Sequence, residues 1–225
     1  GEVASAMATT FIKAELGRWL HEASAAASDA DVKRAMDICV DNANQAIFGA
    51  ANSNPTYAGM GTTLVLGVFR PGRLLMGHIG DSRGYRWRNG VLQQITKDHS
   101  LLQEQIDAGM LTPEQAQYAA NKNLVTRALG VEDMVLLETH QHDVVPGDVY
   151  LMCSDGLSDM LRDAQIAEIM AAHPSLSDMG EALVAAANEA GGRDNIAVVL
   201  ARAVGTNDPS VTKSWWPFKR LSGHA

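Results

Sequence analysis

The sequence has no long apolar run and little cysteine. No segment approaches the roughly 20 consecutive apolar residues that a membrane-spanning helix needs. The opening Gly1–Ser5 also lacks the basic segment and apolar core of a secretory signal, which favours a cytoplasmic location. The chain has two cysteines, Cys39 and Cys153, in different kinds of predicted element. They give no indication of a disulfide framework.

Positive charge is also scarce. The chain carries 18 Lys and Arg against 26 Asp and Glu, and its net charge is −8. A general nucleic-acid binder usually presents a basic face, so this balance argues against a nucleic-acid partner. The hydrophobic content of 46% and the charged content of 20% are typical of a globular protein. A length of 225 residues suits one domain with a sizeable core.

Asp81, Asp155 and Asp194 each stand beside a short apolar run that is typical of a buried strand. The runs are, in order, 74–79, 149–152 and 196–200. Strands of this kind deliver the residues at their ends to a common edge of a sheet, where loops can bring them together. Clustered carboxylates raise one another's pKa unless a positive charge lies among them. Hard cations such as Mg²⁺ or Mn²⁺ are the usual partners of such oxygen ligands, so the sequence predicts a metal-dependent enzyme.

Apolar periodicity and turn residues predict an α+β fold. Expected helices cover 3–21, 31–50, 162–172 and 176–190, helical composition covers 98–130, and expected strands cover 62–69, 73–79, 85–88, 91–95, 135–139, 148–152 and 196–204. Asn89-Gly90 is the strongest short hairpin signal in the chain. We therefore expect the four strands between 62 and 95 to form a meander in an antiparallel sheet.

Six motifs, taken together and in order, resemble a known family. They are Gly61-Thr62-Thr63, Gly80-Asp81-Ser82-Arg83-Gly84-Tyr85, Thr96-Lys97-Asp98-His99-Ser100, Leu124-Val125-Thr126-Arg127-Ala128-Leu129-Gly130, Ser154-Asp155-Gly156-Leu157-Ser158-Asp159 and Gly192-Arg193-Asp194-Asn195. This series resembles the PPM-type, or type 2C-like, metal-dependent serine/threonine protein phosphatases, particularly the bacterial ones. Each motif alone is weak, but six in the same order and spacing are specific, and they span nearly all of residues 1–204.

The resemblance implies a four-layer α/β/β/α sandwich of two antiparallel sheets flanked by helix pairs. It implies hydrolysis of phosphoserine and phosphothreonine in proteins by a metal-activated water, with two core Mn²⁺ or Mg²⁺ ions and a possible third. The partners would be phosphorylated proteins and a bacterial serine/threonine kinase pathway that the enzyme opposes. The phosphatase domain would cover 1–204, with a flap at about 101–130, and a Trp-rich C-terminal tail would cover 205–225.

The same resemblance assigns site residues. Asp155 and Asp194 match ligands of the core metal pair, and Asp81 and Asp159 match ligands of the third metal. Each of these aspartates has an ordinary alternative, because Asp-Gly, Asp-Asn and Gly-Asp-Ser sequences are common turns in which Asp accepts backbone hydrogen bonds. Arg127 would contact a substrate phosphate, with a structural ion pair as its alternative. No residue is assigned as a catalytic acid, base or nucleophile.

Three residues invite other chemistry. A cysteine-based phosphatase needs an arginine six residues after its cysteine, but Asp159 occupies that place after Cys153, so this mechanism is excluded. Cys153 is instead expected to be buried at the end of a strand. His78 and His99 are candidates for metal ligands or general acids, with packed or capping histidines as the favoured alternative.

The chain departs from the family pattern in one respect. The aspartate-glycine-x-glycine-glycine loop whose aspartate bridges the two core metals does not occur in it. Because the other acidic positions are intact, we interpret the chain as a fragment that begins just after that loop. Without that loop the chain has a second interpretation: it is a catalytically inactive pseudophosphatase or a phosphoprotein-binding module with the same fold.

Overall fold

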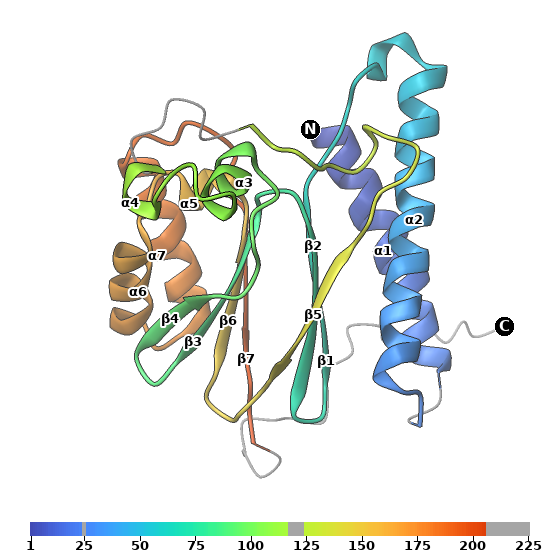
Figure 1. The fold of residues 1–225 in the computed structure, drawn as a ribbon. Coiled ribbons are helices and arrows are strands. Elements are labelled where there is room, and N and C mark those ends of the chain that lie inside the picture. Colours follow the sequence, from blue (N-terminus) through green and yellow to red (C-terminus); the bar gives the residue numbers. More distant parts are fainter. Residues whose placement is uncertain (24–25, 117–123, 206–225) are drawn as a thin grey trace, which may run out of the picture.

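The computed structural model describes residues 1–23, 26–116 and 124–205, which form four layers (Figure 1). Two helices, α1 (Glu2–Glu22) and α2 (Asp29–Ser53), cover one outer side of a pair of sheets. On the other outer side lie α6 (Asp163–Ala172) and α7 (Leu176–Glu189). The layer order is helix pair, sheet, sheet, helix pair, so the expected α/β/β/α sandwich is confirmed.

Both sheets are antiparallel. The first has the order β1-β2-β5 and consists of β1 (Leu64–Arg70), β2 (Arg73–Ile79) and β5 (Glu138–Asp143). The second has the order β4-β3-β6-β7 and consists of β4 (Val91–Gln94), β3 (Arg83–Arg88), β6 (Val149–Cys153) and β7 (Val198–Arg202). The expected single meander is wrong, because β2 and β3 belong to different sheets. The chain crosses between the two sheets at 80–82, which places Asp81 in the crossing.

The short connections follow local turn chemistry. Asn89 and Gly90 join β3 to β4 with φ values of +51° and +79°, the left-handed pair that a tight hairpin requires. Arg70 and Arg73 pair across the β1–β2 hairpin, and Gly72 in its turn has a φ of +75°. Both hairpins lie where the sequence predicts them.

Three apolar clusters fill the spaces between the layers. The first packs α1 and α2 onto the first sheet, and the second packs α6 and α7 onto the second sheet. Between the sheets lies a smaller cluster built on Leu74, Met76 and Tyr150. The two sheets are therefore held face to face by few large side chains, and each sheet is held more extensively by its own helix pair.

Two predicted elements differ from the structure. The region 98–130 contains, in its described part, only the short helices α3 (Leu101–Asp107) and α4 (Pro113–Ala116). The strand expected at 135–139 lies at Glu138–Asp143, because Val135 and Leu137 pack instead against the first apolar cluster.

Two other short helices are η1 (Pro55–Tyr57) and α5 (Asp155–Ser158). Residues 117–123 of the flap and 206–225 of the tail lie outside the described residues.

Among the described helices, none combines the length and the apolar character needed to span a membrane.

Candidate metal centre

Asp81 lies in the crossing between the two sheets, directly after Gly80 at the end of β2. It is buried, with 9% of its surface exposed. Gly80 has a φ of +98°, and a Cβ on it would lie 2.4 Å from the Thr63 side chain, so only glycine fits there. The next residue, Ser82, shares a hydrogen bond of 2.7 Å with the Thr63 hydroxyl. The residues on both sides of Asp81 therefore lie against Thr63, the residue before β1.

Asp155 begins α5 immediately after β6, and Asp159 follows the end of the same helix. The Asp159 N–H donates to the Asp155 carbonyl oxygen at 2.8 Å, the spacing of one helical turn. The two residues therefore stand one helical turn apart. Asp155 is half-buried and Asp159 is exposed, so the pair lies at the rim of the second sheet.

Asp194 lies in the loop before β7 and is exposed. This loop is tied to the start of α5 through Ser154. The Ser154 hydroxyl donates to the Asn195 carbonyl oxygen at 3.0 Å and accepts from the Ala197 N–H at 3.0 Å. Because Ser154 precedes Asp155 and Asn195 follows Asp194, the same hydrogen bonds bring the two aspartates to one edge of the sheet.

The charges of these carboxylates interact. Burial and, after it, the negative charges of Asp155, Asp98 and Asp159 together raise the pKa of Asp81 to about 6. Burial also raises the pKa of Asp155, followed by the charges of Asp194 and Asp159. The aspartates predicted from the sequence therefore form one acidic cluster. A partly buried group of oxygen ligands in mutual repulsion has the chemistry that a hard divalent cation relieves, so the residues fit Mn²⁺ or Mg²⁺.

Arg127 lies beside this cluster. If Gly80 carried a Cβ atom, that atom would lie 3.3 Å from the Arg127 backbone carbonyl oxygen. Arg127 is exposed to solvent. The nearby bridge between Thr62 and Leu129 holds this end of the flap against the start of β1.

Three further residues are Cys153, which the sequence analysis discussed, and Asp98 and Glu138, to which it gave no role. Cys153 ends β6 and is buried, and burial raises the pKa of its thiol to about 12, so it is no nucleophile at neutral pH. Asp98, in the motif at 96–100, contributes to the negative charge around Asp81, a role that the sequence pattern does not predict. Its carboxylate binds Arg83 through hydrogen bonds of 2.7 and 3.0 Å. Glu138 was also missed, because nothing in the local sequence marks it.

In the metal-free protein, we expect Asp81→Asn to raise stability at pH 7 by about 1–2 kcal/mol. The folded pKa of about 6 exceeds the unfolded value of 3.8. The folded state thus binds this proton more tightly, and wild-type stability falls as pH rises from about 4 to 6. The full shift corresponds to about 3 kcal/mol, but asparagine is itself a buried polar group, so the gain is smaller.

Chemical denaturation in EDTA at pH 4 and pH 7 measures this effect. Asp41→Asn, at an exposed position on α2, serves as the control and should change neither value. A stability difference for Asp81→Asn that is equal at both pH values would contradict the raised pKa of Asp81.

Comparison of the sequence and the structure with known proteins points to one family. The sequence profile of the protein phosphatase 2C family matches residues 1–201. The serine/threonine phosphatase Stp of Listeria innocua is 35% identical over 200 residues, which cover 89% of this chain and 78% of that protein. The crystal structure of the Mycobacterium tuberculosis serine/threonine phosphatase PstP/Ppp superposes with a TM-score of 0.80 at 36% identity, covering 91% of this chain and 83% of the other. A structure of the catalytic domain of PstP in complex with two manganese ions gives a TM-score of 0.76 at 36% identity, covering 91% and 82%.

Proposed function

This chain belongs to the protein phosphatase 2C family of metal-dependent serine/threonine protein phosphatases, and from that premise we propose that Asp155 and Asp194 hold its core divalent cations. Asp81 and Asp159 hold a third, more weakly bound cation. The observation that carries this assignment is the acidic cluster itself, in which burial and neighbouring carboxylates raise the pKa of both Asp81 and Asp155. A set of carboxylates that repel one another in the metal-free protein is stabilised when a cation binds.

The chain's own residues then hold and orient the reactants. Bound Mn²⁺ or Mg²⁺ supplies Lewis acidity, which lowers the pKa of a water and stabilises charge on phosphoryl oxygens. Ser154 keeps Asp155 and Asp194 at one edge through its hydrogen bonds to Asn195 and Ala197. Arg127 is exposed beside the cluster, and its planar guanidinium suits a bidentate contact with a substrate phosphate.

Recognition of the substrate is local. A net charge of −8 offers no long-range attraction to phosphorylated proteins, so affinity comes from the cations, Arg127 and the flap at 101–130. The phosphatase domain covers 1–204. Its substrates are phosphoserine and phosphothreonine proteins supplied by a bacterial serine/threonine kinase. Cys39 and Cys153 are both free thiols, which suits the reducing cytoplasm.

Calorimetric titration with Mn²⁺ tests the assignment. We expect Asp155→Asn and Asp194→Asn each to weaken Mn²⁺ binding at least tenfold, because each removes a charged ligand from the core ions. Asp81→Asn and Asp159→Asn should remove only the weakest class of bound ion. Asp143→Asn, an exposed carboxylate at the end of β5, is the control and should bind like wild type.

Hydrolysis of a phosphothreonine peptide in Mn²⁺, Mg²⁺ and EDTA completes the test. Because the bridging aspartate does not occur in this sequence, turnover with either ion, and none in EDTA, is the expected result when an aspartate-glycine-x-glycine-glycine loop is joined upstream of Gly1. Unchanged Mn²⁺ binding in both Asp155→Asn and Asp194→Asn would overturn the ligand assignment. Binding of the phosphopeptide without turnover in any metal would assign this chain to the alternative, a phosphoprotein-binding module.

A further inference from the structure

The motif at 96–100 lies alongside residues 78–84, and four of its five residues are hydrogen-bonded to that segment. The joined pairs are Thr96 with Gly84 at 2.9 Å, Lys97 with His78 at 2.6 Å, Asp98 with Arg83 at 2.7 Å and His99 with Gly80 at 2.9 and 3.1 Å. Since 78–84 contains the crossing between the sheets, the segment 96–100 supports the backbone that carries Asp81.

The contact between His99 and Gly80 is the most specific of these. The His99 N–H donates to the Gly80 carbonyl oxygen at 2.9 Å, and the Gly80 N–H donates to His99 Nδ1 at 3.1 Å. A backbone N–H can donate only to a nitrogen that carries no proton. His99 therefore has its proton on Nε2, and this tautomer is required for the second hydrogen bond.

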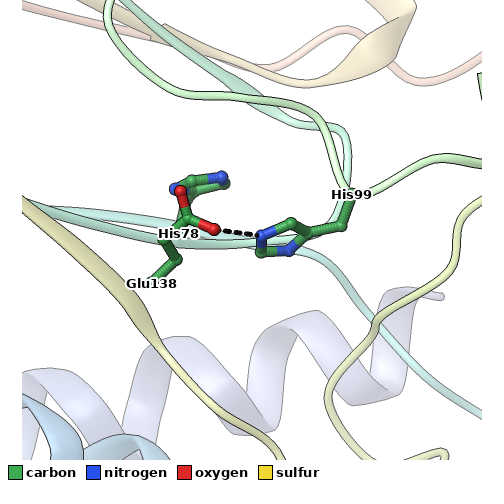
Figure 2. A group of neighbouring side chains, drawn as sticks. All are labelled: His78, His99 and Glu138. Carbon is green, nitrogen blue, oxygen red and sulfur yellow. Dashed lines mark hydrogen bonds and ion pairs between the residues drawn. The ribbon is translucent and has the colours of Figure 1, made fainter. Parts of the chain in front are cut away.

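Glu138 fixes that tautomer from the neighbouring strand β5. His99 Nε2 lies 3.0 Å from a Glu138 carboxylate oxygen, and a dashed line marks this contact in Figure 2. The other carboxylate oxygen lies 2.8 Å from His140 Nε2. Burial opposes ionisation, but the hydrogen bonds from His140 and His99 lower the pKa of Glu138 to about 2. Glu138 is thus an ionised acceptor at neutral pH and holds the proton of His99 on Nε2.

The same geometry argues against a metal site in this cluster, although ligand atoms of His78, His99 and Glu138 all lie within 4.8 Å of one another. A metal on His99 Nε2 would move the ring proton to Nδ1, where it would face the Gly80 N–H. The His78 and His99 rings are also stacked, with centroids 4.6 Å apart and planes at 20°. Lone pairs in nearly parallel rings do not converge on one ion.

His99 also contacts the flap. Its carbonyl oxygen accepts a hydrogen bond from the Thr126 N–H at 2.9 Å, one residue before Arg127. The Arg127 carbonyl oxygen in turn lies next to Gly80. One buried residue, 7% exposed, therefore contacts both the backbone that precedes Asp81 and the segment that carries Arg127.

We propose that His99, held in one tautomer by Glu138, is a positioning residue that fixes the Gly80–Asp81 backbone so that the Asp81 carboxylate faces the acidic cluster. This inference rests on the proposed cation role of Asp81. It assigns the motif at 96–100 a function in the metal centre without direct contact with a cation.

Two substitutions of His99 separate positioning from simple packing. Asparagine places its side-chain oxygen near the position of Nδ1 and can accept the Gly80 N–H, whereas leucine fills the space and accepts nothing. We expect His99→Leu to raise amide exchange of Gly80 at least tenfold and to weaken the Asp81-dependent class of Mn²⁺ binding at least fivefold. His99→Asn should remain within about twofold of wild type in both measurements.

Two further variants complete the design. Asp81→Asn combined with His99→Leu should weaken Mn²⁺ binding no more than Asp81→Asn alone, because both act on the same ligand. Met170→Ala, in the separate cluster under α6, is the control for lost stability and should leave Mn²⁺ binding and Gly80 exchange unchanged. Wild-type Mn²⁺ affinity in a folded His99→Leu protein would overturn the proposal.

Failure of the cation assignment gives a different result. If Asp81→Asn binds Mn²⁺ like wild type, the role of Asp81 is wrong, and Gly80 exchange alone decides the positioning role. Protection of Gly80 in wild type and His99→Asn but not in His99→Leu would then support it. Equal exchange in all three proteins would refute it.

Discussion

Replacing Gly156 by alanine is expected to disrupt the proposed metal centre and to cost the fold about 3 kcal/mol or more. Gly156 follows Asp155 in α5. A Cβ at this position would lie 2.3 Å from the Asn195 carbonyl oxygen and 2.9 Å from its carbonyl carbon. Both are backbone atoms of the loop that carries Asp194, so no side-chain rotation can relieve the clash. Either α5 or the loop must move, and Asp155 separates from Asp194.

The usual preference of helices for alanine over glycine opposes this cost by at most about 1 kcal/mol, so the clash decides the sign. Gly180→Ala in α7 provides the matched control. Its Cβ would lie 3.5 Å from Leu200, an ordinary contact, and we expect a gain of about 0.5–1 kcal/mol. Denaturant unfolding and Mn²⁺ titration of both variants give the answer. A Gly156→Ala protein with wild-type stability and Mn²⁺ affinity would show that α5 and the loop that carries Asp194 are not held together as described.

The elements that sequence analysis located correctly are those whose cause is local. Asn89-Gly90 adopts the left-handed pair of conformations that its residue types favour, and no distant contact is needed to explain it. The helix pairs show their apolar faces directly in the sequence, as in α7, where Met179, Leu183 and Ala187 are buried at helical spacing. In these elements the residue pattern and the burial coincide.

The division of strands between two sheets could not be predicted in this way. β2 pairs with β5, so that His78 lies opposite Glu138, sixty residues later in the chain. β5 itself is a polar edge strand of sequence Glu-Thr-His-Gln-His-Asp and shows no apolar alternation. The pattern therefore favoured the preceding apolar residues Val135 and Leu137, which pack beside the strand's path instead of pairing within it.

The candidate site shows the same limit. Asp81, Asp155 and Asp194 were recognisable because each adjoins a strand, and strand ends meet at sheet edges. Their common electrostatic environment includes Asp98, which acts on Asp81 from the segment after the next hairpin. Such side-chain partners are set by how the loops pack, and residue spacing alone does not encode them.

A second large effect is expected away from the metal centre, at Asp148. This residue precedes β6, is 1% exposed, and accepts hydrogen bonds at 2.7 Å from both Nε and a terminal nitrogen of Arg88. It also accepts from the Val145 N–H at 2.9 Å and from the Tyr150 hydroxyl at 3.1 Å. Asp148→Ala removes the acceptor of the Val145 N–H, and Arg88 and the Tyr150 hydroxyl keep only the Asp143 carbonyl oxygen, at 2.8 and 3.4 Å. Breaking a buried ion pair costs about 3–5 kcal/mol, and because Arg88 is partly exposed we expect about 3 kcal/mol.

The pH dependence distinguishes this ion pair from packing. Burial raises the pKa of Asp148, but the hydrogen bonds from Arg88, Val145 and Tyr150 outweigh it and lower the pKa below its usual value. A carboxyl with a lowered folded pKa stabilises the fold above its unfolded pKa of 3.8 and loses that contribution as pH falls. The difference in unfolding free energy between wild type and Asp148→Ala should therefore be full at pH 7 and shrink below about pH 4.

Asp143→Ala, exposed at the end of β5, should stay within about 0.5 kcal/mol of wild type throughout. A difference for Asp148→Ala that persists unchanged at low pH would mean that shape, and not charge, holds β3 to β6 at this end of the sheet.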